Sequence, residues 1–262
     1  MLAQADILQV ERVSKSFLNN GKREQVLQDI SFCVKGGEII SVLGESGCGK
    51  STLLNVVGGF EKSDRGKVFF AGKVVDRPSR RCVMLFQHYG LLPWRSVLKN
   101  VELGLEDLKI TKKARKERAF TYLELVGLDD KADRFPHQLS GGMQQRVAIA
   151  RALALEPELL LMDEPFAALD TLNRYYLQDE LLRLQEKEKT TIILVTHDID
   201  EAVYLSDRVL IMDANPGRMK KEINIQTTRP RDRSHGDFQY YRKMIFEEFR
   251  LNRPAAAIEF NI

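Results

Sequence analysis

Short apolar runs alternate with helical patterns along much of the 262-residue chain. Residues 39–43, 159–162 and 192–195 form nearly continuous apolar runs, which predict strands buried on both faces of a sheet. Residues 50–57 have the pattern of a helix, and Gly58 and Gly59 are suited to end it. Strand, loop, helix and strand in this order predict an α/β fold.

The middle of the chain has a different pattern. Residues 93–156 have a mainly helical pattern. It predicts one helix over 111–126 closed by Gly127 and another over 143–155 ending before Pro157. They predict a helical lobe inserted between strands of the sheet. After about residue 226 the segment TTRPRDRSHGD predicts a polar linker, and 238–249 has apolar residues at helical spacing. We expect this final helix to pack back on the domain.

The stretch from Gly44 to Ser51 fits the pattern G-x-x-x-x-G-K-[ST] between a predicted strand and a predicted helix. Glycines let backbone N–H groups turn onto phosphate oxygens, Lys50 can reach the β and γ phosphates, and the Ser51 hydroxyl can bind Mg²⁺. The helix N-terminus that follows favours an anion. A chance glycine turn is the alternative. As a nucleotide site, the motif leaves kinase, GTPase and transport ATPase open.

Two acidic residues, Asp163 and Glu164, close the predicted strand 159–162. An Asp at the carboxyl end of a neighbouring strand can reach the Mg²⁺ shell beside Ser51. Glu164 can orient and deprotonate an attacking water. Alone, this pattern would indicate a strand end or a helix cap, but the upstream phosphate-binding motif favours the catalytic interpretation.

The segment LSGGMQQR, residues 139–146, decides between these classes. Ser140, Gly141 and Gly142 expose N–H groups and a hydroxyl at the start of a predicted helix, which makes a second anion-binding end. Here the sequence resembles the ATP-binding-cassette (ABC) ATPases, whose signature is LSGGQ; Met143 stands at the fifth position and Gln144 follows it. The resemblance extends from residue 8 to about residue 225.

This resemblance assigns roles to further residues in chain order. Gln87 matches the Q-loop glutamine, Asp170 the D-loop aspartate, His197 the switch histidine at the γ phosphate, and Phe17 the aromatic that stacks on adenine. The implied catalytic residues are Glu164, His197 and Gln87, and the implied Mg²⁺ ligands are Ser51, Gln87 and Asp163. The implied ATP contacts are Phe17, Gly44, Glu45, Ser46, Gly47, Cys48, Gly49, Lys50, Ser51, Thr52, Ser140, Gly141, Gly142, Gln144 and Asp170.

The resemblance also implies an architecture, namely a P-loop NTPase (RecA-like) core with a small antiparallel β subdomain and an inserted helical subdomain. We therefore expect residues 1–88 to form the β subdomain and the first part of the core, and 89–157 the helical subdomain. Residues 158–225 would complete the core, and 226–262 would form a linker and helix. ATP and Mg²⁺ are the implied cofactors, sandwiched in a head-to-tail homodimer.

Composition limits the possible partners and compartment. Lys and Arg total 40 against 37 Asp and Glu, so a nucleic-acid partner is not expected, and the basic run 112–118 is interpreted as a solvated face. The three cysteines have no CxxC spacing, which indicates reduced thiols. The apolar runs are too short to span a membrane, and MLAQADILQVER lacks a signal-peptide layout. The resemblance to ABC ATPases implies a peripheral protein on the cytoplasmic face of the inner membrane.

Finer features resemble the ATPase subunits of bacterial importers for nitrate, sulfonates and taurine. They are LLPWRSVLKNV from Leu91, DEPFAALD from Asp163 and THDIDEAVYLSDRVLIM from Thr196. The implied partners are transmembrane permease subunits and, indirectly, a solute-binding protein. Leu91, Leu92, Pro93 and Trp94 are candidates for the permease socket, although a packed core tryptophan is the alternative. An exporter or lipid-trafficking ATPase, or a soluble ABC ATPase, remains the competing function.

Two departures from the family pattern affect the partner surfaces rather than the ATPase assignment. The pair His88-Tyr89 follows the Q-loop glutamine, and Ala167 stands where the D-loop often has Ser. Phe17 also lacks the hydroxyl of the more usual Tyr. These departures leave the solute group and the coupling to the permease open.

Overall fold

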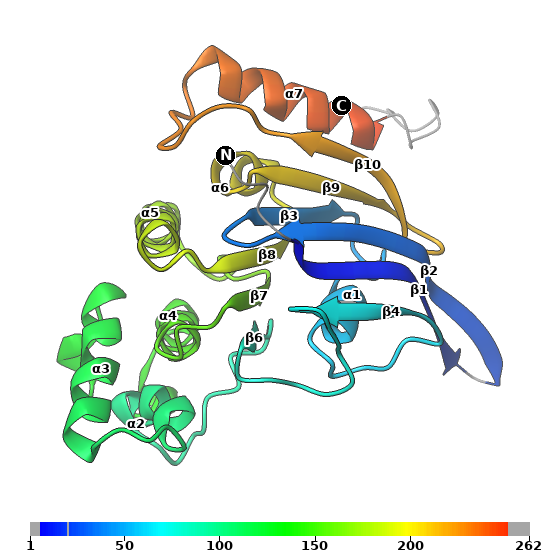
Figure 1. The fold of residues 1–262 in the computed structure, drawn as a ribbon. Coiled ribbons are helices and arrows are strands. Elements are labelled where there is room, and N and C mark those ends of the chain that lie inside the picture. Colours follow the sequence, from blue (N-terminus) through cyan, green and yellow to red (C-terminus); the bar gives the residue numbers. More distant parts are fainter. Residues whose placement is uncertain (1–5, 20, 251–262) are drawn as a thin grey trace, which may run out of the picture.

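The computed structural model describes residues 6–19 and 21–250 and contains two sheets (Figure 1). The smaller sheet is antiparallel and has the order β2-β1-β4-β5. Its strands are β1 (Asp6–Asn19), β2 (Lys22–Lys35), β4 (Arg65–Phe70) and β5 (Lys73–Val74). Val10 pairs with Phe32 of β2 on one side and Val68 of β4 on the other, which places β1 in the middle of this sheet.

The larger sheet has six strands in the order β10-β9-β3-β8-β7-β6. Five run parallel, and β10 pairs with β9 antiparallel at one edge. The three predicted strands are confirmed as the central ones, and each is buried along its whole length, as a sheet covered on both faces requires. The strands are β3 (Ile39–Gly44), β6 (Cys82–Leu85), β7 (Leu159–Asp163), β8 (Thr191–Thr196), β9 (Arg208–Asp213) and β10 (Arg218–Asn224).

One expectation about this sheet is wrong. The strand that ends in Asp163 is not the immediate neighbour of β3, because β8 pairs with both β3 and β7 and lies between them. Parallel strands nevertheless end at the same edge of a sheet, so the carboxyl ends of β3, β8 and β7 remain together. The predicted proximity of Asp163 to Ser51 therefore does not depend on direct strand pairing.

The predicted helices are confirmed to within one or two residues. α1 spans Lys50–Val57, α3 spans Lys112–Leu125 and α4 spans Gly141–Leu153. The Thr111 hydroxyl accepts a bond from the N–H of Ala114 at the start of α3. Further helices are α2 (Val97–Glu102), α5 (Thr171–Glu188), α6 (Ile199–Leu205) and α7 (Gly236–Arg250), with short 3₁₀ turns at Leu103–Leu105, Asp129–Lys131 and Pro136–Gln138.

Helix α5 is absent from the sequence prediction for a physical reason. Its buried positions are Leu177, Gln178, Leu181 and Gln185, so two of the four are glutamines and the apolar stripe is incomplete. Gln185 is accommodated because its side-chain amide donates to the Gly37 carbonyl at 2.6 Å. Tertiary hydrogen bonding thus buries residues that a hydrophobic pattern assigns to the surface.

The core lies on both faces of the larger sheet. Alternate residues of each strand point to opposite faces, so Leu160 and Leu194 join the cluster that includes residues of α2 to α7, whereas Leu161 and Val195 join the other cluster. That second cluster contains α1 and the inner face of the antiparallel sheet. Within the described residues, no helix has both the length and the apolar character needed to cross a lipid bilayer.

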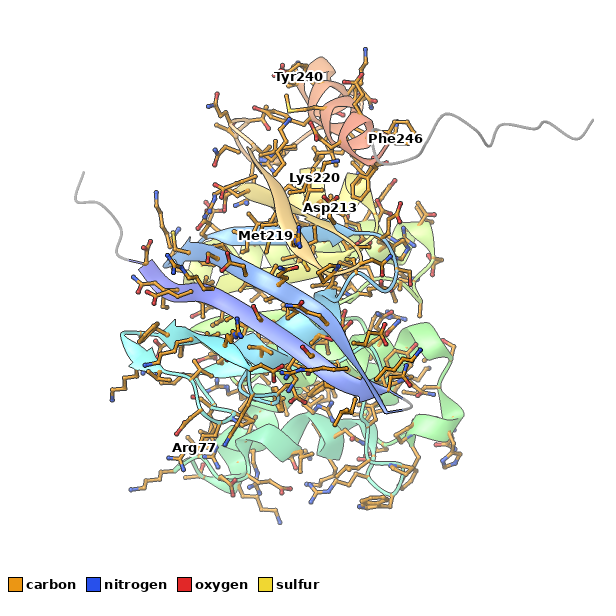
Figure 2. The ribbon with its side chains drawn as sticks, turned by 90° about the vertical axis from the view of Figure 1, so that its right-hand side faces the viewer. Arg77, Asp213, Met219, Lys220, Tyr240 and Phe246 are labelled. Atoms are coloured by element: carbon orange, nitrogen blue, oxygen red, sulfur yellow. The ribbon has the colours of Figure 1, made fainter. Side chains whose placement is uncertain are left out.

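The C-terminal helix packs on the domain as expected. Phe238 and Ile245 of α7 are buried in the core cluster that includes residues of α6, whereas Tyr240 and Phe246 are exposed. Figure 1 shows α7 beside α6 and β10, and Figure 2 shows Tyr240 and Phe246 at the end of the molecule opposite Arg77.

Candidate active site

The glycine-rich loop joins β3 to α1, as the sequence predicts. Gly47 and Gly49 have φ values of +82° and +98°, in the left-handed region that favours glycine. A Cβ atom at Gly49 would lie 2.8 Å from Leu27 Cδ2, so this position also lacks space for a side chain. The Gly49 conformation ends the loop directly before α1 begins at Lys50, which leaves the helix N-terminus facing the loop.

The ammonium group of Lys50 is held by this loop. Its Nζ donates to the carbonyl oxygens of Gly44 at 2.7 Å and Glu45 at 2.9 Å, and the residue is only 6% exposed. A buried cation, a helix N-terminus and a glycine turn converge there. This donor set fits the phosphate chain of a nucleotide, because each of its parts favours negative charge.

A hydroxyl and a carboxylate meet beside the loop. Asp163 is the last residue of β7 and is 6% exposed, and its carboxylate lies close enough to the Ser51 side chain to be influenced by it. Burial raises the pKa of Asp163, and the neighbouring Ser51 side chain acts in the opposite direction. Both groups offer the hard oxygen ligands that Mg²⁺ prefers, so the pair fits a Mg²⁺ site.

Glu164 and His197 follow the ends of adjacent strands β7 and β8. The His197 Nδ1 atom lies 3.1 Å from Glu164 Oε1, and the Glu164 N–H donates to the Val195 carbonyl at 2.9 Å. The φ of Glu164 is +49°, a left-handed conformation that is uncommon for a residue with a side chain and costs on the order of 1 kcal/mol. The surrounding contacts therefore hold the Glu164 carboxylate in a defined direction.

One of these contacts comes from Gln145, which the motif analysis does not single out. Its Nε2 donates to the Glu164 carbonyl at 3.2 Å, and its Oε1 accepts from the N–H of Ala168 at 3.2 Å. Gln145 is 5% exposed and lies on α4 three residues before buried Ala148. A polar residue on the apolar face of a helix needs a hydrogen-bond partner. The sequence signal that could have identified Gln145 is therefore a glutamine at a buried position of this helix.

The signature segment begins α4. The Ser140 hydroxyl accepts from the Met143 N–H at 3.3 Å, and a Cβ at Gly142 would lie 3.1 Å from the Ala168 carbonyl oxygen. The amide of Gln144 donates to the carbonyls of Pro136 and Leu139, so in this structure it braces its own loop. Its contact with nucleotide stays a prediction.

The remaining predicted residues lie at separate places. Asp170 starts α5, where its side chain accepts from the Asn173 N–H at 3.0 Å. Gln87 is exposed just after β6. Phe17 on β1 is 40% exposed, and the Lys15 ammonium lies 4.9 Å from its ring centroid. The structure therefore joins Lys50, Ser51, Asp163, Glu164 and His197 by direct contacts or chain adjacency, and their roles stay predictions.

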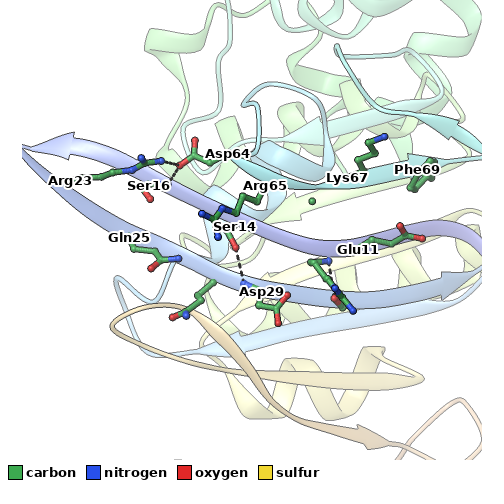
Figure 3. A pocket seen from close by; sticks show the side chains of 14 residues that line it. Glu11, Ser14, Ser16, Arg23, Gln25, Asp29, Asp64, Arg65, Lys67 and Phe69 are labelled. Atoms are coloured by element: carbon green, nitrogen blue, oxygen red, sulfur yellow. Dashed lines mark hydrogen bonds and ion pairs between the residues drawn. The ribbon is translucent and has the colours of Figure 1, made fainter.

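A polar groove of about 1190 Å³ lies across β1, β2 and β4, away from the glycine-rich loop (Figure 3). Its charged and polar groups bind one another: the Arg23 guanidinium donates to Asp64 at 2.9 Å, and the Asp29 N–H donates to the Ser14 hydroxyl at 3.0 Å. The glycine-rich loop does not line this groove, so its volume is unrelated to the candidate phosphate site.

Comparison with known proteins agrees with this geometry. The ABC transporter family model matches residues 27–167. An uncharacterized ABC transporter ATP-binding protein of Methanocaldococcus jannaschii is 51% identical over 91% of this chain and 89% of its own length. The aliphatic sulfonates import ATP-binding protein SsuB of Bacillus subtilis is 44% identical over 90% and 91% of the two chains. The bicarbonate transport ATP-binding protein CmpD of Synechocystis is 43% identical over 95% and 90%.

Solved structures give the same result. A dimeric ATP-binding cassette in a post-hydrolysis state with ADP and Pi superimposes with a TM-score of 0.78 at 32% identity, covering 84% of this chain and all of that one. A part of the ABC transporter complex cbiONQ from Clostridium perfringens has a TM-score of 0.74 at 29% identity, covering 95% and 96%.

Proposed function

This chain belongs to the ABC transporter family as an ATP-binding and ATP-hydrolysing subunit, and from that premise we propose that it drives import of a small solute such as a sulfonate, taurine, nitrate or bicarbonate. The observation that carries the direction of transport is the similarity, over about nine-tenths of the chain, to relatives named for sulfonate import and bicarbonate transport. The solute assignment rests on those relatives alone. The residues of the candidate site are suited to ATP chemistry and do not indicate which solute is transported.

Within one chain, the glycine-rich loop and Lys50 would bind the phosphates, and Ser51 and Asp163, with Gln87, would hold Mg²⁺. The ion would neutralise phosphate charge during hydrolysis. Glu164 would accept a proton from the attacking water. His197 lies 3.1 Å from the Glu164 carboxylate and would orient that carboxylate. The hydrogen bonds of Gln145 and Val195 to the Glu164 backbone would maintain this direction.

The second half of each ATP site would come from another copy of the chain. Within the described residues, the Ser140 hydroxyl bonds its own helix at Met143, and Cβ atoms placed on Gly141 and Gly142 would lie nearest to Tyr89 and Ala168 rather than to Lys50 or Ser51. A head-to-tail homodimer would bring Ser140 and its helix N-terminus onto ATP bound by the partner, with Asp170 at the same interface. The post-hydrolysis cassette with ADP and Pi is dimeric, which supports this arrangement.

The proposed permease socket includes Trp94, which is 72% exposed, so the alternative of a packed core tryptophan is wrong. Phe60 and Phe86 are also exposed, and their rings lie in edge contact with each other, with centroids 5.1 Å apart. Large exposed aromatics of this kind indicate a protein contact. A peripheral position on the cytoplasmic membrane face follows from such a partner.

The first experiment tests whether two copies of the chain share each ATP site. The Glu164→Gln chain with ATP and Mg²⁺ should form a dimer in light scattering, whereas Ser140→Arg in the same background should stay monomeric yet bind ATP. A monomer in both cases would contradict the shared-site arrangement.

The second experiment tests the transporter. The chain, with Trp94→Ala as the matched control, is used to capture partners from gently solubilised native membranes. We expect a polytopic membrane subunit with the parent chain and much less of it with Trp94→Ala. In proteoliposomes containing the captured complex and the solute-binding protein, uptake of labelled ethanesulfonate, taurine, nitrate and bicarbonate would then identify the solute. Recovery of ribosomes or nucleic acid without a membrane subunit would overturn the importer proposal, and outward transport would identify an exporter.

A further inference from the structure

Helix α6 connects the His197 loop to the core and is short. It spans Ile199–Leu205, only seven residues, and a helix of this length is unstable alone because nucleation is costly. Its N-terminus is capped by Asp198, whose carboxylate accepts from the N–H groups of Asp200 at 2.8 Å and Glu201 at 3.2 Å. Its last carbonyl groups need partners from elsewhere.

Arginines of the C-terminal segment supply those partners. The Arg231 guanidinium donates to the carbonyl oxygens of Val203 at 2.6 Å, Tyr204 at 3.2 Å and Ser206 at 2.7 Å. Arg229 donates to the Leu205 carbonyl at 2.6 Å. The predicted polar linker is therefore not a free tether, because two of its arginines cap the end of α6.

Arg231 is 7% exposed, which is unusual for a residue in a polar, turn-rich segment. Burial lowers its pKa to about 10, and the neighbouring Arg229 acts in the same direction. The guanidinium remains charged at neutral pH, and a cation at a helix C-terminus is favourable. Its rigid fork can engage several carbonyls at once, which a lysine ammonium group on its flexible stem does less well.

Two further arginines extend these contacts. Arg233 donates to the Gln178 side chain at 2.6 Å, and its guanidinium carbon lies 3.9 Å from the Tyr175 ring centroid and 3.5 Å from that of Tyr204. Arg242 of α7 donates to Asp200 at 2.6 Å. The four residues Arg229, Arg231, Arg233 and Arg242, here called the arginine clamp, thus contact both ends of α6 and the first half of α5.

The held helix begins next to the candidate site. His197 directly precedes Asp198, and Asp198 also forms an ion pair with Arg174 of α5 at 3.2 Å. Arg174 in turn donates to the Leu169 carbonyl at 3.3 Å, one residue before Asp170. A loosened α6 would therefore move the His197 loop and the start of α5, and a shift of about 1 Å at a reacting centre can lower a rate by about two orders of magnitude.

We propose that the arginine clamp positions His197 for ATP hydrolysis through α6, with Arg231 and Arg242 as positioning residues that do not touch the nucleotide. The proposal rests on the proposed role of His197 at the γ phosphate. It gives the C-terminal segment a role in turnover beyond stabilising the fold.

The test compares Arg231→Lys, Arg242→Gln and the control Lys243→Met in the full chain. Lys243 lies beside Arg242 on α7, and its side chain is 77% exposed. Its Nζ atom is 3.9 Å from Oε1 of Glu247. We expect Arg231→Lys to lower kcat about tenfold and Arg242→Gln about threefold, with KM for ATP and nucleotide affinity unchanged. Hydrogen exchange in residues 197–205 should accelerate in both, and Lys243→Met should match the parent.

Arg242→Gln tests the proposal even if Arg231→Lys does not fold, because it removes an exposed contact. A folded Arg231→Lys or Arg242→Gln chain with the parent kcat would overturn the proposal. A fall in nucleotide affinity equal to the fall in kcat would also overturn it, because that result indicates general unfolding.

A double-mutant comparison separates this proposal from the assignment of His197 itself. His197→Ala should remove most of the parent activity, and adding Arg242→Gln to it should cause no further loss, because the clamp acts through His197. A further threefold loss in that background would overturn the clamp proposal while leaving His197 essential. Full activity of His197→Ala would refute the role of His197 and, with it, the clamp.

Discussion

The Nδ1 atom of His197 lies 3.1 Å from Oε1 of Glu164, although the two residues are 33 positions apart. Each residue follows the carboxyl end of its strand, and β7 and β8 are adjacent and parallel, so the sheet brings both side chains to one edge. The left-handed backbone of Glu164 then sets the direction of its carboxylate. In the proposed function, Glu164 would accept a proton and His197 would orient its carboxylate, an arrangement suited to the activation of water.

Glu164→Gln should lower kcat for ATP hydrolysis by about 10²–10⁴-fold, because an amide cannot accept the proton. ATP affinity should stay near that of the parent, since Lys50 and the loop are unchanged. Turnover and nucleotide titration measure the two effects. The control is Glu158→Gln, which removes a carboxylate paired with Arg81 on the surface. Parent-like turnover of Glu164→Gln would exclude Glu164 as the base.

Gln145→Leu should lower kcat by roughly tenfold and the free energy of unfolding by about 1–3 kcal/mol, because it removes two partners of backbone groups beside Glu164. Gln145→Glu separates the two contacts, since a carboxylate still accepts from Ala168 but no longer donates to Glu164. Turnover and urea unfolding of both variants check the result. If both retained the parent kcat at lower stability, Gln145 would be only structural.

Gly49→Ala should weaken ATP binding and destabilise the fold by about 1–3 kcal/mol. The new Cβ would lie 2.8 Å from Leu27 Cδ2 and would occupy a backbone with φ of +98°. Gly21→Ala is the matched control, because Gly21 has φ of +76° but nothing within 4 Å of its Cβ position. It should cost about 1 kcal/mol and leave ATP affinity unchanged. Equal ATP affinities for the two variants would contradict the assigned role of the loop.

Stability should depend on pH through Glu201. This residue is 5% exposed, and burial raises its pKa from 4.5 to about 7. The Thr196 hydroxyl, which donates to the Glu201 carboxylate at 2.7 Å, and Arg174 lower the pKa. Asp198 raises it further. Between pH 4.5 and 7 the folded state binds more protons than the unfolded state, so the free energy of unfolding falls as pH rises.

Glu201→Gln removes this titration. The pH dependence of its free energy of unfolding should be smaller than that of the parent by roughly 3 kcal/mol across the same window, an order-of-magnitude figure from the shift. Urea unfolding at several pH values measures the difference. Identical pH profiles for the two proteins would show that the carboxyl group of Glu201 is not perturbed.

Motif residues and core strands are predictable because local chemistry constrains them. The glycine-rich loop needs glycines for its backbone conformation, and β3, β7 and β8 need continuous apolar runs because helices and the second sheet cover both faces. The sequence alone therefore determined the glycine-rich loop between β3 and α1, the acidic strand end, the α/β class and helices α3 and α4.

Tertiary structure decided what depends on contacts between distant segments. It placed β8 between β3 and β7, exposed Trp94, and gave Gln145 its partners at Glu164 and Ala168. It also buried Arg231 in a segment whose composition predicts a polar linker. A local pattern records how polar a residue is, but whether that polarity faces water or a buried carbonyl depends on which other segment the fold brings to it.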